Sequence, residues 1–309
     1  MVDKLIARII ATQNPSVVGL DPALSYLPEK EDFAKDFEQA AQSLFAFNKE
    51  IIDAVFDIVP AVKVQIAYYE MYGVAGLSAF YRTLLYAKSK GLIVISDAKR
   101  NDIGSTASCY SDAYLGKTAL KGASLAAFPS DYLTVNPYLG TDGIEPFLRN
   151  VQNFGKGIFV LVKTSNPSSG ELQDLILSTG EPLYMAVGAL TEVWGKAYIG
   201  EYGYSAVGAV VGATHKEQAQ KLRNEFPNTL FLVPGYGAQG GKAEDLAVCF
   251  DSKGLGAIVN SSRGIICAYK SKPYEGLSVG AAARAATIDM QADILNALKV
   301  SKSITKIGD

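Results

Sequence analysis

The sequence predicts an α/β fold, a single closed (β/α)₈ (TIM) barrel, on three observations. Short apolar, β-branched segments recur eight times, and segments with helical apolar periodicity lie between them. The strand segments are nearly continuously apolar, as expected for a parallel sheet that is covered on both faces. Polar residues end almost every one of them, which is typical of a barrel whose site lies at the carboxyl ends of its strands.

The predicted strands cover residues 16–21, 61–65, 92–99, 132–136, 157–165, 206–214, 229–235 and 256–261. Helical periodicity is clearest over residues 33–56, 68–89, 181–199 and 243–249, with an amphipathic helix expected in 1–14 and a last helix near 280–299. A doubly wound open sheet is the alternative fold. It is disfavoured because no Gly-x-Gly-x-x-Gly motif follows the first strand.

We expect one barrel domain spanning residues 1–309, because no linker or low-complexity segment divides the chain. A chain that is 49% hydrophobic and 19% charged can bury a large core. The formal net charge of −2 and the lack of a basic stripe disfavour nucleic acid as a partner. No apolar run reaches the roughly 18 residues of a membrane span, so no membrane association is expected.

The cysteines and the histidine limit the possible chemistry. Cys109, Cys249 and Cys267 form no Cys-x-x-Cys pair, which predicts a reduced, cytoplasmic protein without a disulfide framework or zinc site. The single histidine, His215, excludes a multi-histidine metal centre. Acid–base chemistry is therefore expected from Asp, Glu, Lys or Tyr.

The third predicted strand ends in a cluster of charges. Asp97 and Lys99 are two residues apart, so they leave the same face of the strand, and Asp102 follows in the loop or the next helix. Holding such charges together away from water is costly unless they are paired and used. A surface salt-bridge trio is the alternative, and spacing alone does not decide between the two.

Other predicted strands also end in polar residues. These are Asp21, Lys63, Gln65, Asn136, Lys163, Ser165, Thr214, Ser261, Ser262 and Arg263, of which Asn136 and Thr214 are expected to be ordinary loop residues. Glycine-rich segments at residues 234–241 and 260–264 follow the seventh and eighth strands, the usual phosphate site of such barrels. Backbone amides and the Arg263 guanidinium are suited to hold an anion there.

These motifs resemble the orotidine 5′-phosphate decarboxylase family. The resemblance rests on Asp97-x-Lys99-x-x-Asp102-Ile103, on Lys63-Val64-Gln65, on the 234–241 segment and on Arg263, and the chain is similar to the longer of the family's subgroups. It implies a lyase of pyrimidine biosynthesis that converts the nucleotide orotidine 5′-monophosphate to UMP and CO₂. It also implies a homodimer that uses no cofactor and no metal.

The resemblance assigns roles residue by residue. It implies a catalytic network of Lys63, Asp97, Lys99 and Asp102, in which Asp102 reaches in from the partner subunit. It further implies substrate contacts from Asp21 and Lys63 to the ribose, Ser165 to the pyrimidine, Pro234 in the glycine-rich loop, Gln239 and Arg263 to the phosphate, and Thr106 across the interface. No role is assigned to Ser261 or Ser262, or within residues 166–204.

Two other functions remain as alternatives. A metal-dependent sugar-phosphate decarboxylase or aldolase of the same superfamily shares the Asp-x-Lys-x-x-Asp block, but it would use Mg²⁺ and a Glu near the end of the second strand. Lys63 stands there instead, and an ammonium cannot ligate a metal. A catalytically inactive barrel that only binds nucleotides is expected to have lost Lys99 or one of the acids, and none is lost.

Overall fold

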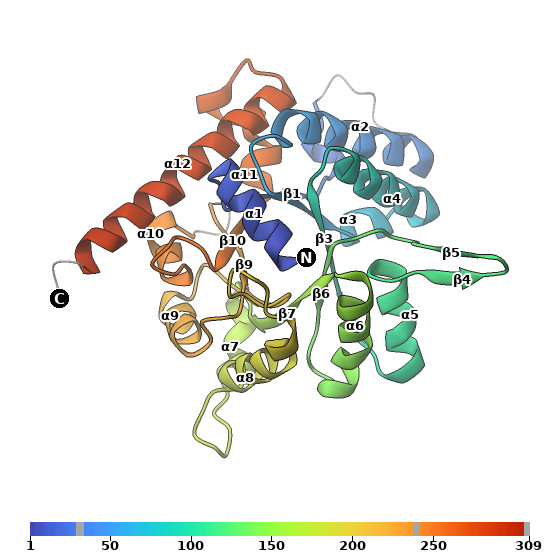
Figure 1. The fold of residues 1–309 in the computed structure, drawn as a ribbon. Helices are drawn as coiled ribbons and strands as arrows, with labels where there is room; N and C mark the ends of the chain where they lie inside the picture. The colour runs from blue at the N-terminus through green and yellow to red at the C-terminus, as the bar shows by residue number, and fades with distance from the viewer. Residues whose placement is uncertain (29–33, 238–240, 306–309) are drawn as a thin grey trace.

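The computed structural model describes residues 1–28, 34–237 and 241–305, and in it eight parallel strands close into a barrel (Figure 1). The chain visits the strands in order around the barrel, and the last strand pairs with the first. This confirms the predicted fold, and each strand falls within its predicted segment or one residue beyond it. The barrel strands are β1 (Ser16–Leu20), β2 (Ala61–Gln65), β3 (Ile93–Arg100), β6 (Tyr132–Val135), β7 (Gly157–Lys163), β8 (Val207–Val211), β9 (Phe231–Pro234) and β10 (Ala257–Ser261).

Helices surround the barrel and connect its strands (Figure 1). The α-helices are α1 (Val2–Thr12), α2 (Phe37–Val55), α3 (Ala67–Glu70), α4 (Gly73–Ser89), α5 (Gly104–Tyr114), α6 (Thr141–Phe154), α7 (Gly170–Gln173), α8 (Leu183–Gly195), α9 (Lys216–Glu225), α10 (Ala243–Leu246), α11 (Arg263–Ile266) and α12 (Val279–Thr305). Short 3₁₀ turns are η1 (Leu24–Tyr26), η2 (Pro167–Ser169), η3 (Lys196–Tyr198), η4 (Ala247–Cys249), η5 (Ala268–Lys270) and η6 (Lys272–Tyr274). The single helix expected over residues 68–89 is two helices, because Gly73 has a φ of +59°.

A two-stranded antiparallel hairpin of β4 (Thr118–Leu120) and β5 (Ala123–Leu125) projects from the barrel after α5 (Figure 1). It was not among the predicted strands. Each of its strands has three residues, all of them exposed, so the alternating burial that marks a strand in sequence is absent. Gly122, with a φ of +81°, makes the turn.

The amino-terminal end of the barrel is closed by packing. Tyr132 and Phe159 are fully buried and their rings stack with centroids 4.8 Å apart. Each precedes by two residues a residue that lines the pocket described below, so both point into the barrel, beneath that pocket. Gly157 and Gly208 leave room for the two rings, because a Cβ at either glycine would overlap one of them. Helix α1 lies across this end of the barrel (Figure 1).

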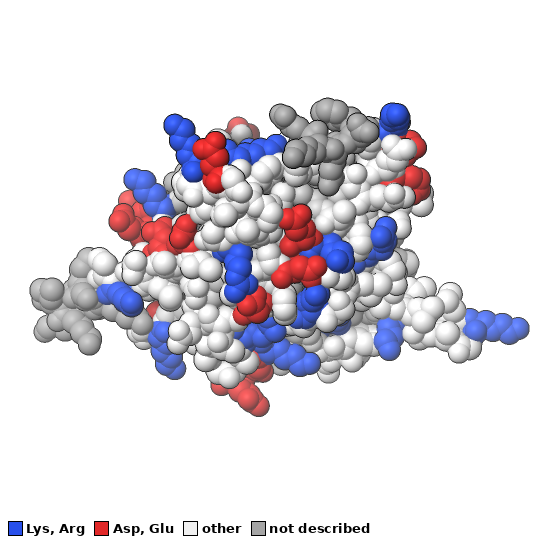
Figure 2. All heavy atoms as spheres, turned by 90° about the horizontal axis from the view of Figure 1, so that it is seen from above, with Lys and Arg blue, Asp and Glu red and all other residues white. Residues whose placement is uncertain are grey.

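The surface carries no large field of one sign on the face shown in Figure 2, where acidic and basic side chains are interspersed with uncharged ones. In the part of the chain that the structure describes, no helix combines the length and the apolar character needed to cross a bilayer.

Candidate active site

A pocket of about 710 Å³ opens at the carboxyl ends of the barrel strands. This volume is in the range of sites that hold a small molecule. Its charged and polar lining comes from residues spread along the chain from Asp21 to Arg263, and its apolar lining includes Leu161, Val210, Leu232 and Pro234. The polar lining residues are Asp21, Lys63, Gln65, Asp97, Lys99, Thr134, Thr164, Ser165, Asn166, Gln173, Asn260, Ser261, Ser262 and Arg263.

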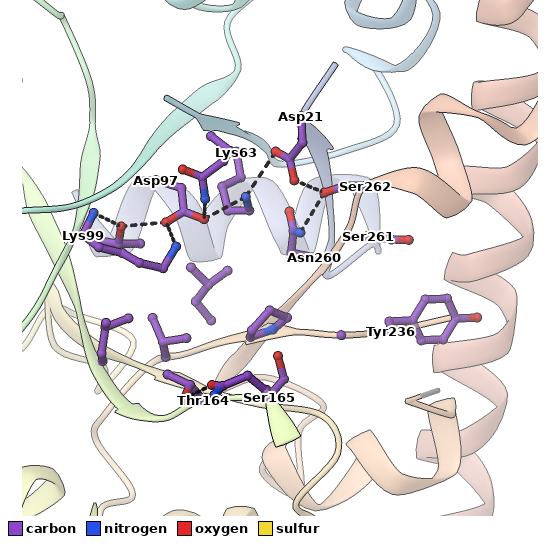
Figure 3. A pocket seen from close by; sticks show the side chains of 18 of the residues that line it. Asp21, Lys63, Asp97, Lys99, Thr164, Ser165, Tyr236, Asn260, Ser261 and Ser262 are labelled. Atoms are coloured by element: carbon purple, nitrogen blue, oxygen red, sulfur yellow. Dashed lines mark hydrogen bonds and ion pairs between the residues drawn. The ribbon is translucent and has the colours of Figure 1, made fainter. Parts of the chain in front are cut away.

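Alternating acids and bases form a chain along one side of this pocket (Figure 3). Lys99 Nζ lies 2.6 Å from Asp97 Oδ1, and Lys63 Nζ lies 2.9 Å from Asp97 Oδ2. Lys63 also contacts Asp21, with Nζ 3.4 Å from Oδ1. The side chains of Lys63 and Asp97 are only 5% and 10% exposed, whereas that of Lys99 is 45% exposed. Lys99 is therefore the member of the chain that is most open to a ligand.

Burial and charge act in opposite directions on this network. Burial alone would lower the pKa of Lys63, but the charges of Asp21 and Asp97 outweigh it and raise that pKa above its ordinary value. Burial would likewise raise the pKa of the Asp97 carboxyl, but Lys63 and Lys99 outweigh it and hold that pKa well below its usual range. Both groups of the buried pair consequently stay ionised around neutral pH.

The backbone of β3 is irregular where it carries these charges. Its pairing with β6 shifts between Ser96 and Arg100, and Lys99 adopts a φ of +47°. A left-handed conformation costs a residue with a Cβ about 1–2 kcal/mol. Such strain persists where the surroundings hold it, and it gathers at functional sites. Arg100 turns away from the pocket to Glu70, with Nη2 2.7 Å from Oε1.

Three residues of the site were not assigned a role from the sequence. Gln65 Nε2 donates to Asp97 Oδ2 over 2.9 Å, and Thr134 Oγ1 donates to Asp97 Oδ1 over 2.9 Å. Ser262 Oγ donates to Asp21 Oδ2 over 2.6 Å. A sequence signal existed for Thr134, because period-two alternation places it on the same face of its strand as Tyr132.

Ser165 lies across the pocket from the charged chain (Figure 3). The end of β8 approaches it closely, because a Cβ on Gly212 would come within 2.7 Å of the Ser165 backbone. Thr214 Oγ1 donates to the Ser165 carbonyl over 3.3 Å. Thr214 itself is exposed and acts as a loop residue beside the site, as expected.

The glycine-rich segments also reach the pocket. Pro234, Gly235 and Arg263 line it, and Arg263 is exposed as the first residue of α11. Gly235 and Gly237 have φ values of +102° and +71°, which other residues rarely adopt. Gln239, the other residue expected at the phosphate, lies outside the described residues.

Several polar residues that were predicted near the barrel mouth do not line this pocket. Asp102 is half-buried and accepts a 2.8 Å hydrogen bond from the Ile103 amide, and Thr106 is exposed on α5. The surface trio considered as an alternative is therefore not formed. Lys163 is fully buried and donates to Asp174, with Nζ 2.7 Å from Oδ1. Asn136 caps a turn, as a loop residue does, by accepting from the Tyr138 amide.

His215 lies at the amino terminus of α9, and its Nε2 is 3.2 Å from Ser169 Oγ. Burial and the nearby Lys163 lower its pKa. Within residues 1–28, 34–237 and 241–305, no group of three or more His, Cys, Asp or Glu side chains is placed to hold a metal ion. The donor set of the pocket, two ammonium groups and a guanidinium beside two carboxylates, suits an anionic ligand.

The chain is similar to members of one known protein family. Residues 18–273 match the model of the orotidine 5′-phosphate decarboxylase / HUMPS family. A protein of Caldicellulosiruptor saccharolyticus named orotidine 5′-phosphate decarboxylase is 46% identical over 277 residues, which cover 87% of this chain and 90% of the relative. A protein of the same name from Rhodopirellula baltica is 46% identical over 299 residues, covering 93% and 96%.

Solved structures that are named as OMP decarboxylases also superpose on this chain. The structure of the Leishmania donovani OMP decarboxylase superposes with a TM-score of 0.71 at 28% identity, over 96% of this chain and 98% of that one. A more distant match is the Methanocaldococcus jannaschii orotidine 5′-monophosphate decarboxylase in complex with the inhibitor BMP. At 18% identity and a TM-score of 0.57, over 89% of this chain and 97% of that one, it shares the fold.

Proposed function

This chain belongs to the orotidine 5′-phosphate decarboxylase family, whose reaction in pyrimidine biosynthesis it carries out, and we propose that it does so without a cofactor, through a carbanion held by Lys99. The observation that carries the proposal is the Lys63–Asp97–Lys99 chain, in which a half-exposed ammonium is held against a buried carboxylate at the pocket wall.

In the proposed step, the bond between pyrimidine C6 and its carboxylate breaks and CO₂ leaves. The bonding electron pair remains on C6, and no cofactor is available to spread its charge. The Lys99 ammonium stabilises this pair by charge and then gives a proton to C6, which forms UMP. Lys99 takes up a proton from solvent before the next turnover. Asp97, beside the leaving carboxylate, holds Lys99 in place through its Oδ1.

The rest of the substrate is assigned to the rest of the pocket. Asp21 and Lys63 are proposed to bind the ribose hydroxyls and Ser165 the pyrimidine edge, across the cavity. Arg263 and the loop from Pro234 through Gln239 are proposed to bind the phosphate. Binding energy from the phosphate, which takes no part in bond breaking, can hold the ring in position at Lys99.

A homodimer is proposed to complete each site, with Asp102 and Thr106 of one subunit reaching the pocket of the other. Neither residue lines the pocket of its own chain. Two exposed apolar side chains lie near Asp102: Ile103, the next residue, is 53% exposed, and Leu139, which like the Asp102 carbonyl adjoins Gly143, is 46% exposed. A partner subunit that packs on this surface would cover both.

The relatives at 42–46% identity carry the decarboxylase name, and the alternative weighed from the sequence is a metal-dependent sugar-phosphate decarboxylase or aldolase. An absorbance assay of orotidine 5′-monophosphate loss, run with and without excess EDTA, separates the two chemistries. Full activity in EDTA is expected because Lys63 stands where a metal ligand would be needed. Activity that disappears on chelation and returns with Mg²⁺ would contradict the cofactor-free mechanism.

A further inference from the structure

Thr134, on β6, makes three hydrogen bonds to the part of β3 that carries Asp97 and Lys99, and no role has been assigned to it so far. Its side chain is buried, with 1% of the residue exposed. Its hydroxyl accepts from the amides of Ala98 and Lys99, at 3.1 and 3.0 Å, and lies 2.9 Å from Asp97 Oδ1. Both amides can only donate, so the hydroxyl proton must point to Asp97.

These three bonds use the whole hydrogen-bonding capacity of a threonine hydroxyl, one donor and two acceptor sites. Thr134 therefore has no site left for the substrate, although it lines the pocket. Any effect on the reaction must pass through Asp97 and Lys99.

The two amides belong to the irregular part of β3. Here the pairing with β6 shifts, and Lys99 has its positive φ. At this shift the side chain of Thr134 supplies the acceptor for the amides of both Ala98 and Lys99. The hydroxyl thus holds Lys99 in a backbone conformation that a lysine does not favour.

The same hydroxyl also fixes the orientation of the Asp97 carboxylate. Asp97 Oδ2 accepts from Lys63 and Gln65, and Oδ1 accepts from Lys99 and Thr134. Two donors on each oxygen fix the rotation of the carboxylate, and with it the direction from which Lys99 Nζ is held.

We propose that Thr134 is a positioning residue for the decarboxylation, whose single hydroxyl couples the Lys99 backbone to the Asp97 carboxylate. The inference rests on the proposed role of Lys99 as proton donor. It adds that the donor's geometry depends on a residue from a neighbouring strand that touches no reacting atom.

The test compares Thr134→Val, which keeps the shape and removes the hydroxyl, with Thr134→Ser, which keeps the hydroxyl. We expect Thr134→Val to lower kcat about 100-fold, the scale for a small misplacement of a catalytic group. KM for orotidine 5′-monophosphate and the Kd for UMP should change less than about threefold. Thr134→Ser should restore kcat to within about fivefold of the wild type.

Thr287→Val is the matched control, because Thr287 is a fully buried threonine of α12 whose hydroxyl donates to the Ala283 carbonyl. It should keep the wild-type kcat even where its Tm falls. A wild-type kcat in Thr134→Val, or a similar loss of kcat in Thr287→Val, would overturn the proposal. A raised KM with unchanged kcat would do so too, since it would make Thr134 a binding residue.

If Thr134→Val does not fold, Thr134→Ala removes the hydroxyl without the bulk, and the same split between kcat and KM is expected. The wild-type and Lys99→Ala enzymes are measured alongside. If Lys99→Ala keeps its turnover, the proposed function has failed. If Lys99→Ala is inactive while the hydroxyl-free variants turn over normally, only the role of Thr134 has failed.

Discussion

The Ser262 hydroxyl donates a 2.6 Å hydrogen bond to the Asp21 carboxylate, although 241 residues separate the two in sequence. The bond joins the end of β1 to the end of β10, where the barrel closes. Gly19 makes it possible, because a Cβ there would overlap Ser262 Oγ. Asp21 is thus held from one side by Ser262 and from the other by Lys63.

Ser262→Ala should therefore raise KM for orotidine 5′-monophosphate about tenfold, with a smaller effect on kcat. The reason is that a hydrogen bond to a charged group contributes about 1.5–3 kcal/mol, and here it orients the proposed ribose ligand Asp21. Steady-state kinetics measure the effect. In an Asp21→Ala background, Ser262→Ala should change KM by less than about twofold. Equal effects in both backgrounds would show that Ser262 acts independently of Asp21.

Lys99→Ala should lower kcat by several orders of magnitude, because it removes a contact made mainly in the transition state. UMP binding, measured by calorimetry, should change far less. Lys49→Ala is a suitable control, since Lys49 is an exposed lysine paired with Asp53 on α2. Near-normal turnover of Lys99→Ala would mean that the charged chain is structural.

Arg263→Ala should weaken kcat/KM by roughly 3 kcal/mol or more, as expected for loss of a charge-assisted bidentate contact to phosphate. On the wild-type enzyme, free phosphite should partly restore turnover of orotidine, the nucleoside that lacks the phosphate. An unchanged KM of Arg263→Ala for the phosphorylated substrate would refute the assignment of Arg263 to the phosphate.

Asp97 should make the stability of the protein depend on pH in acid. Its pKa is depressed in the folded state, so its ionisation stabilises the fold above its unfolded pKa of about 3.9, and this contribution is lost as the pH falls further. The difference in the free energy of unfolding between wild type and Asp97→Asn should therefore narrow from pH 6 toward pH 3. Urea denaturation at several pH values measures it, and a difference that widens in acid would be inconsistent with the buried ion pairs.

Mixing two inactive variants tests the shared site. If Asp102 acts in the partner's pocket, a heterodimer of Lys99→Ala and Asp102→Ala subunits has one site with both lesions and one with neither. Random exchange makes about half of the dimers mixed, so about a quarter of the wild-type activity should return if the sites act independently. Each variant incubated alone is the control. No recovery, with exchange demonstrated, would place Asp102 in the site of its own chain.

The barrel and the charged block could be predicted because their signals are local. Strands covered on both faces are continuously apolar, and the period of two places Asp97 and Lys99 on one face. The family resemblance supplied proposals that spacing could not, such as a pyrimidine contact for Ser165 and a phosphate contact for Arg263.

What could not be predicted depends on contacts between distant segments. The bond from Thr134 to Asp97 spans 37 residues, and the one from Ser262 to Asp21 spans 241. Both need the register between strands, which the sequence of one strand does not contain. Lys163 shows the opposite error. Its position at a strand end predicted a place in the pocket, but Lys163 does not line the pocket and instead pairs with Asp174, in the connection that follows its strand.

The stacked rings of Tyr132 and Phe159 make the pocket a blind chamber at its lower end. Substrate entry and the departure of both products then share the upper opening. In the proposed arrangement, UMP bound there by its phosphate blocks the next substrate molecule, so UMP should inhibit competitively. The rate of UMP release then contributes to kcat, together with the rate at which the carbon–carbon bond breaks.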